Sequence, residues 1–110
     1  MQEKPLLILN TCPDTETARA IANALVGQSL AACVNIIPAI QSIYRWQDKI
    51  ECDNEVLLLI KSPQECYPAL EAVILSLHPY ELPEIIVVPI DSGLPGYLNW
   101  INDCSPRCDD

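Results

Sequence analysis

The chain has 110 residues, of which 50% are apolar, and its 15 acidic against 6 basic side chains leave a formal net charge of −9. This length predicts a single domain, residues 1–110, with enough apolar residues for a real core. The negative charge argues against nucleic acid and anionic membrane surfaces as partners, and no apolar run approaches the ~20 residues that span a bilayer. The first five residues lack the pattern of a secretory signal, which predicts a cytoplasmic protein.

The first two predicted elements are a buried strand and an amphipathic helix. Leu6–Thr11 is a short continuous apolar run, as expected of a buried strand. Pro13 and Asp14 stand where a first-turn proline and an early acid favour the start of a helix. Its apolar positions follow at helical spacing and Gly27 is its predicted end; these positions are Ala18, Ile21, Ala22 and Leu25.

A long hairpin is predicted next. One strand starts near Ala31, the other runs from about Ile50 to Ile60, and Gln47–Asp48 joins them. Pro38 interrupts the first arm and predicts a bulge or a free edge, since proline donates no ladder hydrogen bond. The arms exceed the usual strand of ~5–6 residues, so we expect another copy of the chain to complete part of this surface.

A two-residue turn would place aromatic and acidic side chains on one face of this hairpin. Residues directly opposite share a face because side chains alternate with period two. The expected pairs are Trp46 with Lys49, Tyr44 with Glu51, Ser42 with Asp53 and Ile40 with Glu55. Two interpretations stay open: a surface for a cation or small ligand, or a solvated acidic face whose aromatic residues cover a neighbouring subunit.

The second half predicts a helix, a strand and a short final helix. Ser62–Glu65 matches a capping box with proline at the first helical position, although Pro68 can move the start to Tyr67. An apolar stripe leads to the helix end at His78–Pro79; it comprises Leu70, Val73, Ile74 and Leu77. A strand at Glu84–Ile90 with an edge-type Pro89, a short apolar-faced helix from Tyr97 to Cys104 and a frayed tail over residues 105–110 follow.

The element order predicts an α+β fold of the ferredoxin-like βαββαβ type, with two helices on one face of an antiparallel sheet. The RNA-recognition fold shares this order. It needs stacking aromatic residues and a basic sheet, whereas this chain has no phenylalanine and a charge of −9.

Six cysteines and one histidine are the candidate reactive groups. No disulfide framework is expected in a cytoplasmic protein; Cys33 and Cys66 are predicted to be buried apolar residues and Cys108 an exposed thiol. His78 either caps helix carbonyls or joins thiols or carboxylates around copper or zinc. The usual nucleophile and phosphate-loop motifs are missing, and a dyad of His78 with Cys33 or Cys12 stays open.

Five segments of the chain resemble the CutA divalent-cation-tolerance family. They are Leu30–Pro38, Ser42–Trp46, Ile60–Lys61, Leu77–Ile85 and Tyr97–Ile101. The resemblance implies a ferredoxin-like fold, a tight homotrimer similar to the PII signalling proteins, a cytosolic location in a bacterium and a role in tolerance to copper and other divalent metals. It implies no enzymatic reaction.

The chain departs from the family's pattern at several positions. Ala39 and Asp48 stand where many members carry glycine. The copper ligands proposed for some members fall on Asn10, Leu77 and His78, so only His78 matches, and Cys12 stands two residues from Asn10.

Three functions are therefore expected in order. The first is a non-enzymatic homotrimer of metal tolerance that needs no cofactor and binds copper(II) or another divalent metal weakly, through His78 and Cys12. The second is a PII-like regulatory trimer that binds a small metabolite in clefts between subunits. The third is a small enzyme with a Cys–His pair. The candidate ligand cleft is lined by Tyr44, Trp46, Lys61, His78, Tyr80 and Glu84.

Overall fold

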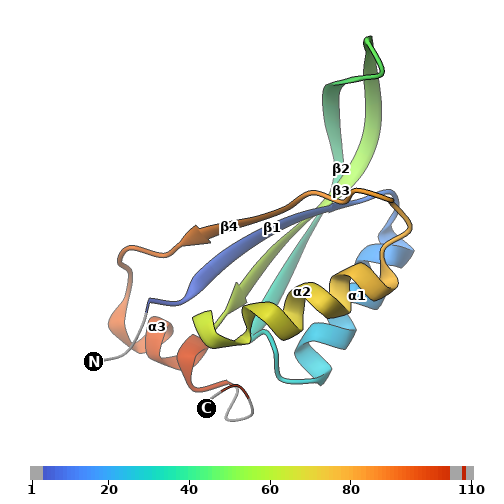
Figure 1. Ribbon diagram of the computed structural model, residues 1–110. Helices are drawn as coiled ribbons and strands as arrows, with labels where there is room; N and C mark the ends of the chain where they lie inside the picture. The colour runs from blue at the N-terminus through green and yellow to red at the C-terminus, as the bar shows by residue number, and fades with distance from the viewer. Residues whose placement is uncertain (1–3, 105–107, 109–110) are drawn as a thin grey trace.

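The computed structural model describes residues 4–104 and 108. Four strands form one sheet in the order β2-β3-β1-β4, and every neighbouring pair is antiparallel. Helices α1 and α2 pack on the sheet, and α3 lies at the end of the sheet where β4 finishes (Figure 1). The elements are β1 (Leu6–Cys12), α1 (Thr15–Gly27), β2 (Cys33–Trp46), β3 (Lys49–Ser62), the 3-10 turn η1 (Gln64–Cys66), α2 (Tyr67–Leu77), β4 (Ile85–Pro89) and α3 (Pro95–Asn102). The ferredoxin-like α+β prediction is confirmed.

The core lies between one face of the sheet and the two longer helices. Its fully buried side chains include Ile8, Leu58 and Ile60 of the sheet, which alternate with side chains that point to the other face. The helices contribute Ile21 and Leu25 of α1 and Leu70 and Ile74 of α2. Burial of these apolar stripes holds the helices on the sheet.

The helix ends differ from the predicted ones in detail. Asp14 is the N-cap of α1 rather than a helical residue, and its Oδ1 accepts a hydrogen bond of 2.7 Å from the Thr17 amide. Gly27 is the last residue of α1, but the left-handed conformation that follows falls on Ser29, at φ 59°. The predicted capping box at Ser62 does not form, and α2 begins at Tyr67, the alternative start predicted from Pro68.

The β2–β3 hairpin projects well beyond the rest of the molecule (Figure 1). Its register is the predicted one, with Trp46 opposite Lys49 and Tyr44 opposite Glu51. Gln47 and Asp48 form the turn at φ 50° and 65°, the positive values that a two-residue hairpin turn requires. The ladder shifts register between Ile37 and Ile40, so the bulge predicted at Pro38 is confirmed.

The sheet face opposite α1 and α2 carries a group of apolar side chains, beside the polar Lys61 and Asn35. By alternation along the strands, Leu7 and Leu9 of β1 and Leu57 and Leu59 of β3 point to this face, and all four are only half-buried. Ile86 and Val88 of β4 and Ile37 of β2 extend it at 48%, 40% and 39% exposure. We call these seven side chains the open sheet face.

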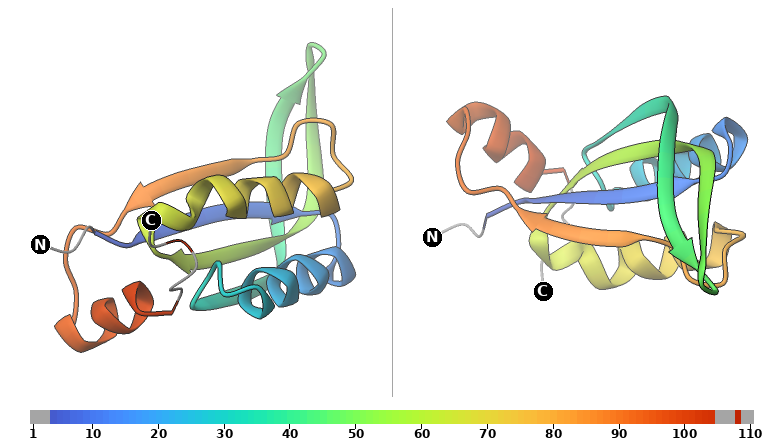
Figure 2. Two further views of the ribbon diagram at one scale, coloured as in Figure 1. Left: turned by 60° about the horizontal axis from the view of Figure 1, so that its bottom comes forward. Right: turned by 90° about the horizontal axis from the view of Figure 1, so that it is seen from above.

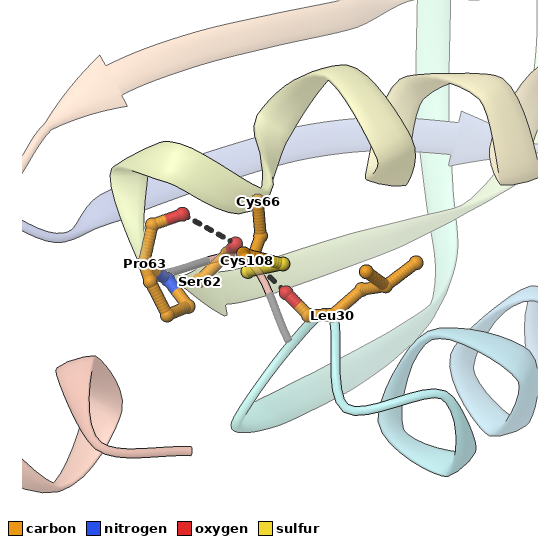
Figure 3. The surroundings of a disulfide bond; sticks show 5 residues. All are labelled: Leu30, Ser62, Pro63, Cys66 and Cys108. Atoms are coloured by element: carbon orange, nitrogen blue, oxygen red, sulfur yellow. Dashed lines mark hydrogen bonds between the residues drawn. A yellow bond between two sulfur atoms is a disulfide. The ribbon is translucent and has the colours of Figure 1, made fainter. Parts of the chain in front are cut away.

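One disulfide corrects the cysteine predictions. Cys66, fully buried at the start of α2, is bonded to Cys108 with their Cα atoms 5.2 Å apart (Figure 3). Cys108 is therefore not an exposed thiol and Cys66 is not a lone buried residue. Beneath the bond, the Ser62 hydroxyl lies 2.9 Å from both the Leu30 and Pro63 carbonyl oxygens, which fastens the turn into η1 (Figure 3).

Three smaller points complete the comparison with the predictions. Cys33 is half-buried rather than buried. Of the predicted frayed tail, residues 105–107 and 109–110 lie outside the described residues. None of the described helices is long and apolar enough to cross a membrane.

Candidate functional site

A cleft of about 370 Å³ lies where the hairpin meets the loop that joins α2 to β4. That loop crosses the hairpin near the point where the hairpin leaves the sheet (Figure 1; Figure 2, left). The lining residues are Thr11, Tyr44, Trp46, Glu55, Tyr80, Glu81, Leu82 and Glu84. Of the six candidate residues, four line this cleft within one chain, namely Tyr44, Trp46, Tyr80 and Glu84, and the cleft between subunits stays a prediction.

The two tyrosines of the cleft each donate a hydrogen bond to a carboxylate. The Tyr80 hydroxyl donates to Glu55 Oε2 at 2.9 Å, and Glu55 is only 8% exposed. The Tyr44 hydroxyl donates to Asp53 Oδ2. Burial and the bond to Glu55 raise the pKa of Tyr80, and the bond to Asp53 raises the pKa of Tyr44 to about 12. Both phenols therefore stay protonated and hold their carboxylates in place.

His78 lies directly behind the cleft and fastens two backbone segments together. Its Nε2 lies 2.7 Å from the Thr11 carbonyl oxygen, and its Nδ1 accepts a bond of 3.2 Å from the Tyr80 amide. Because a carbonyl only accepts, this pattern assigns the ring proton to Nε2. The backbone amide of His78 ends α2 by donating to the Ile74 carbonyl, whereas both ring nitrogens contact groups outside that helix.

Cys12 is fully buried beside the same strand end. Its thiol donates to Asn10 Oδ1 at 3.5 Å, and the Asn10 amide donates to the Glu84 carbonyl at 2.8 Å. Burial, with the nearby Asp14 and Glu55 carboxylates, raises the pKa of the Cys12 thiol to about 11. The thiol therefore stays protonated at neutral pH.

These two residues do not fit a copper ion as they are arranged. A copper ligand at Cys12 would be a thiolate, and a ligand at His78 would be a free ring nitrogen. Both ring nitrogens are instead occupied, and the described residues include no group of three His, Cys, Asp or Glu side chains placed to hold a metal.

Comparison with known proteins agrees with this fold. Residues 6–104 match the family described as CutA1 divalent ion tolerance protein. The chain belongs to the CutA1 family. A CutA1 protein of known structure, from the psychrotrophic bacterium Shewanella sp. SIB1, is 47% identical and superposes with a TM-score of 0.91 over 96% of this chain and 99% of its own.

Curated CutA relatives are equally similar in sequence. The divalent-cation tolerance protein CutA of Thermus thermophilus is 47% identical over 88% of this chain and 94% of its own length. Protein CutA of Mus musculus is 50% identical over 84% of this chain, yet the match spans only 52% of the mouse protein. The chain thus corresponds to most of a bacterial CutA but to about half of an animal one.

Lys61, the remaining predicted cleft residue of this CutA1 chain, does not line the cleft. It pairs with Leu7 and Cys33 across the sheet, and its ammonium group donates to Asn35 Oδ1. Cys33 lies opposite Lys61 and therefore level with Leu7 of β1. His78 instead contacts Thr11, four residues further along β1. The Cys33–His78 pair is therefore not brought together.

Sequence reasoning missed four lining residues as cleft residues. Glu55 could have been found, because the hairpin register already placed it opposite Ile40, on the face that carries Tyr44 and Asp53. Thr11, Glu81 and Leu82 carry no pattern of their own. They line the cleft only because the loop after α2 packs against the hairpin and the end of β1.

Proposed function

We propose that this CutA1 protein acts as a non-enzymatic homotrimer in tolerance to divalent metal ions. The role is supported by membership of the family and by the names of relatives from Thermus thermophilus and Pectobacterium atrosepticum, both divalent-cation tolerance proteins. The trimer and the cytoplasmic location follow from the resemblance described above and are proposed with it.

The open sheet face is the observation that carries the assembly. It exposes Ile37, Ile86 and Val88 beside the half-buried leucines of β1 and β3, and a contiguous apolar patch of this kind marks a protein interface. The projecting hairpin supplies a second surface, with Ile43 and Ile50 both 71% exposed. Contact with two further copies would remove these side chains from water.

Light scattering at low micromolar concentration tests the assembly. We expect a mass of three chains, or three times 12.2 kDa. A monomer at that concentration would contradict the proposal. The charge of −9 per chain sums to −27 in the trimer, so the mass is measured at both low and physiological salt to separate assembly from charge repulsion.

The proposed tolerance role requires no resident copper. A copper ion at His78 must displace a ring hydrogen bond, and one imidazole offers an incomplete ligand set. We expect anaerobic calorimetric titration with copper(II) to show weak binding that is lost in His78→Ala and retained in Cys12→Ser. Tight binding by wild type, or unchanged binding by His78→Ala, would contradict this account of the site.

The aromatic and acidic cleft also favours the second function, a PII-like protein that binds a small ligand. Aromatic side chains and carboxylates converge there from the hairpin and the α2–β4 loop. A small Cys–His enzyme is not favoured, because the Cys12 thiol stays protonated and Cys33 lies level with Leu7, away from His78.

A further inference from the structure

We infer that the cleft between the hairpin and the α2–β4 loop binds an organic ammonium cation, with Glu55 as its charged partner and aromatic side chains around it. The inference names the ligand class for the small-ligand role and rests on that role. Every lining residue used below belongs to the one chain that the structure describes.

The charge of the cleft is the first argument. Three carboxylates line it, from Glu55, Glu81 and Glu84, and no lysine or arginine is among the lining residues. Within the described part of the chain, the one ion pair joins Lys4 to Asp91, so none of the three carboxylates has a cationic partner. A cation in the cleft would be attracted and an anion repelled.

Glu55 provides a second and independent argument. Glu55 is only 8% exposed, and among the described residues its carboxylate accepts one hydrogen bond, from the neutral Tyr80 hydroxyl. A buried carboxylate costs free energy unless it is paired. A cationic ligand would supply the missing partner in a place where solvent screens the interaction only partly.

The nature of the lining argues against a metal ion as the ligand. Calcium and magnesium need about six oxygen ligands at short distance, and no metal-binding group occurs among the residues described. The cleft volume of about 370 Å³ also suits a molecule rather than an ion.

The aromatic side chains define the ligand further. Tyr44, Trp46 and Tyr80 line the cleft together with the apolar Leu82. Both phenols are anchored through their hydroxyl groups, which leaves their rings as contact surface. Aromatic rings around a cation are the usual means of recognising alkylated ammonium groups.

The test compares choline with its neutral isostere 3,3-dimethylbutan-1-ol, which has the same shape without the charge. The full chain carries Trp100→Phe, so that Trp46 is its only tryptophan and reports on the cleft by fluorescence. We expect a saturable change with choline and binding of the neutral isostere roughly tenfold weaker. Equal binding of both, or no saturation with choline, would overturn the inference.

A matched pair of variants tests the role of Glu55. Glu55→Gln keeps an acceptor for Tyr80 and removes the charge. Glu71→Gln is the control, because the Glu71 carboxylate also accepts a tyrosine hydrogen bond, of 2.8 Å from the Tyr67 hydroxyl on α2. We expect choline affinity to fall roughly tenfold in the first and to stay unchanged in the second. An equal loss in both variants would overturn the assignment.

Two further measurements keep the result unambiguous. If Glu55→Gln does not fold, Glu84→Gln, at an exposed lining residue, takes its place. We then expect a smaller loss of choline affinity, and an unchanged affinity would count against the site. Magnesium chloride at the same ionic strength must not displace choline, because displacement would show non-specific attraction.

The two proposals can fail separately. A trimer that does not bind choline overturns this inference alone, and a monomer that binds choline overturns the proposed assembly alone.

Discussion

His78 and Cys12 show how a residue's immediate partners determine its chemistry. Both stand near the strand end where a metal was expected. The imidazole is fastened between the Thr11 carbonyl and the Tyr80 amide, and the thiol is buried against Asn10. Each group therefore serves the packing of β1 against the α2–β4 loop rather than offering a free ligand atom.

The raised pKa of Cys12 predicts a loss of stability at alkaline pH. Between its ordinary pKa near 9 and about 11, the unfolded chain releases the thiol proton and the folded chain keeps it. Folding stability from this group is thus complete below pH 9 and is lost as pH rises towards 11, by at most about 1.4 kcal/mol per pH unit. We expect urea unfolding between pH 8 and 11 to show a shallower decline in Cys12→Ala.

Cys52→Ala, which removes an exposed thiol of the hairpin, is the control and should follow the wild-type curve. The prediction concerns the slope, because loss of the buried sulfur lowers stability at every pH. Parallel curves for wild type and Cys12→Ala would contradict the assigned cause.

At the scale of elements, the hairpin owes its shape to two sites of unusual backbone conformation. The turn uses positive φ at Gln47 and Asp48, and the bulge uses φ 60° at Ala39. Neither site has glycine. The bulge bends the arm where it leaves the body of the sheet, which positions Tyr44 and Trp46 at the cleft.

Ala39→Gly should therefore stabilise the protein. A left-handed conformation costs about 1–2 kcal/mol for a residue with a Cβ, and glycine removes this cost. Glycine also makes the unfolded chain more flexible, which offsets part of the gain, so we expect the free energy of unfolding to rise by about 1 kcal/mol. The measurement is urea denaturation. Ala20→Gly, at an exposed position of α1, should instead lose about 0.5–1 kcal/mol, and a loss in both variants would contradict the strain at Ala39.

At the scale of the whole molecule, one contact between distant parts of the chain and one exposed apolar surface matter most. The disulfide joins residues 42 positions apart and ties the end of the chain to the start of α2. The open sheet face and the projecting hairpin leave apolar side chains exposed on the single chain.

Loss of the disulfide should lower stability chiefly through the unfolded state. For a loop of this length the chain-entropy account predicts about 4 kcal/mol, so Cys108→Ser should unfold at lower urea than wild type under oxidising conditions. Addition of a dithiol should lower the free energy of unfolding of wild type to that of Cys108→Ser. It should lower that of Cys104→Ser, which keeps both bonded cysteines, by the same amount as in wild type. A wild type indifferent to the dithiol and equal to Cys108→Ser would show that the bond does not form in solution.

Trp46 is predicted to be an assembly residue. It is 51% exposed in the single chain, near the tip of the hairpin, where a neighbouring subunit would cover it. Trp46→Ala should then cost about 3–5 kcal/mol per site, measured as dissociation on dilution. Leu75→Ala, at a half-exposed position of α2, is the matched control, and equal dissociation of both variants would place Trp46 outside the interface.

The sequence by itself determined the element order, the hairpin register and the bulge, because these follow from rules that act between near neighbours. A side-chain period of two and a two-residue turn were enough to pair Tyr44 with Glu51. Only the tertiary structure decided that Cys66 bonds to Cys108, that His78 contacts Thr11 across 67 positions, and that Lys61 stays outside the cleft. Such contacts depend on how the layers pack, and no local pattern encodes the distance between residues brought together by packing alone.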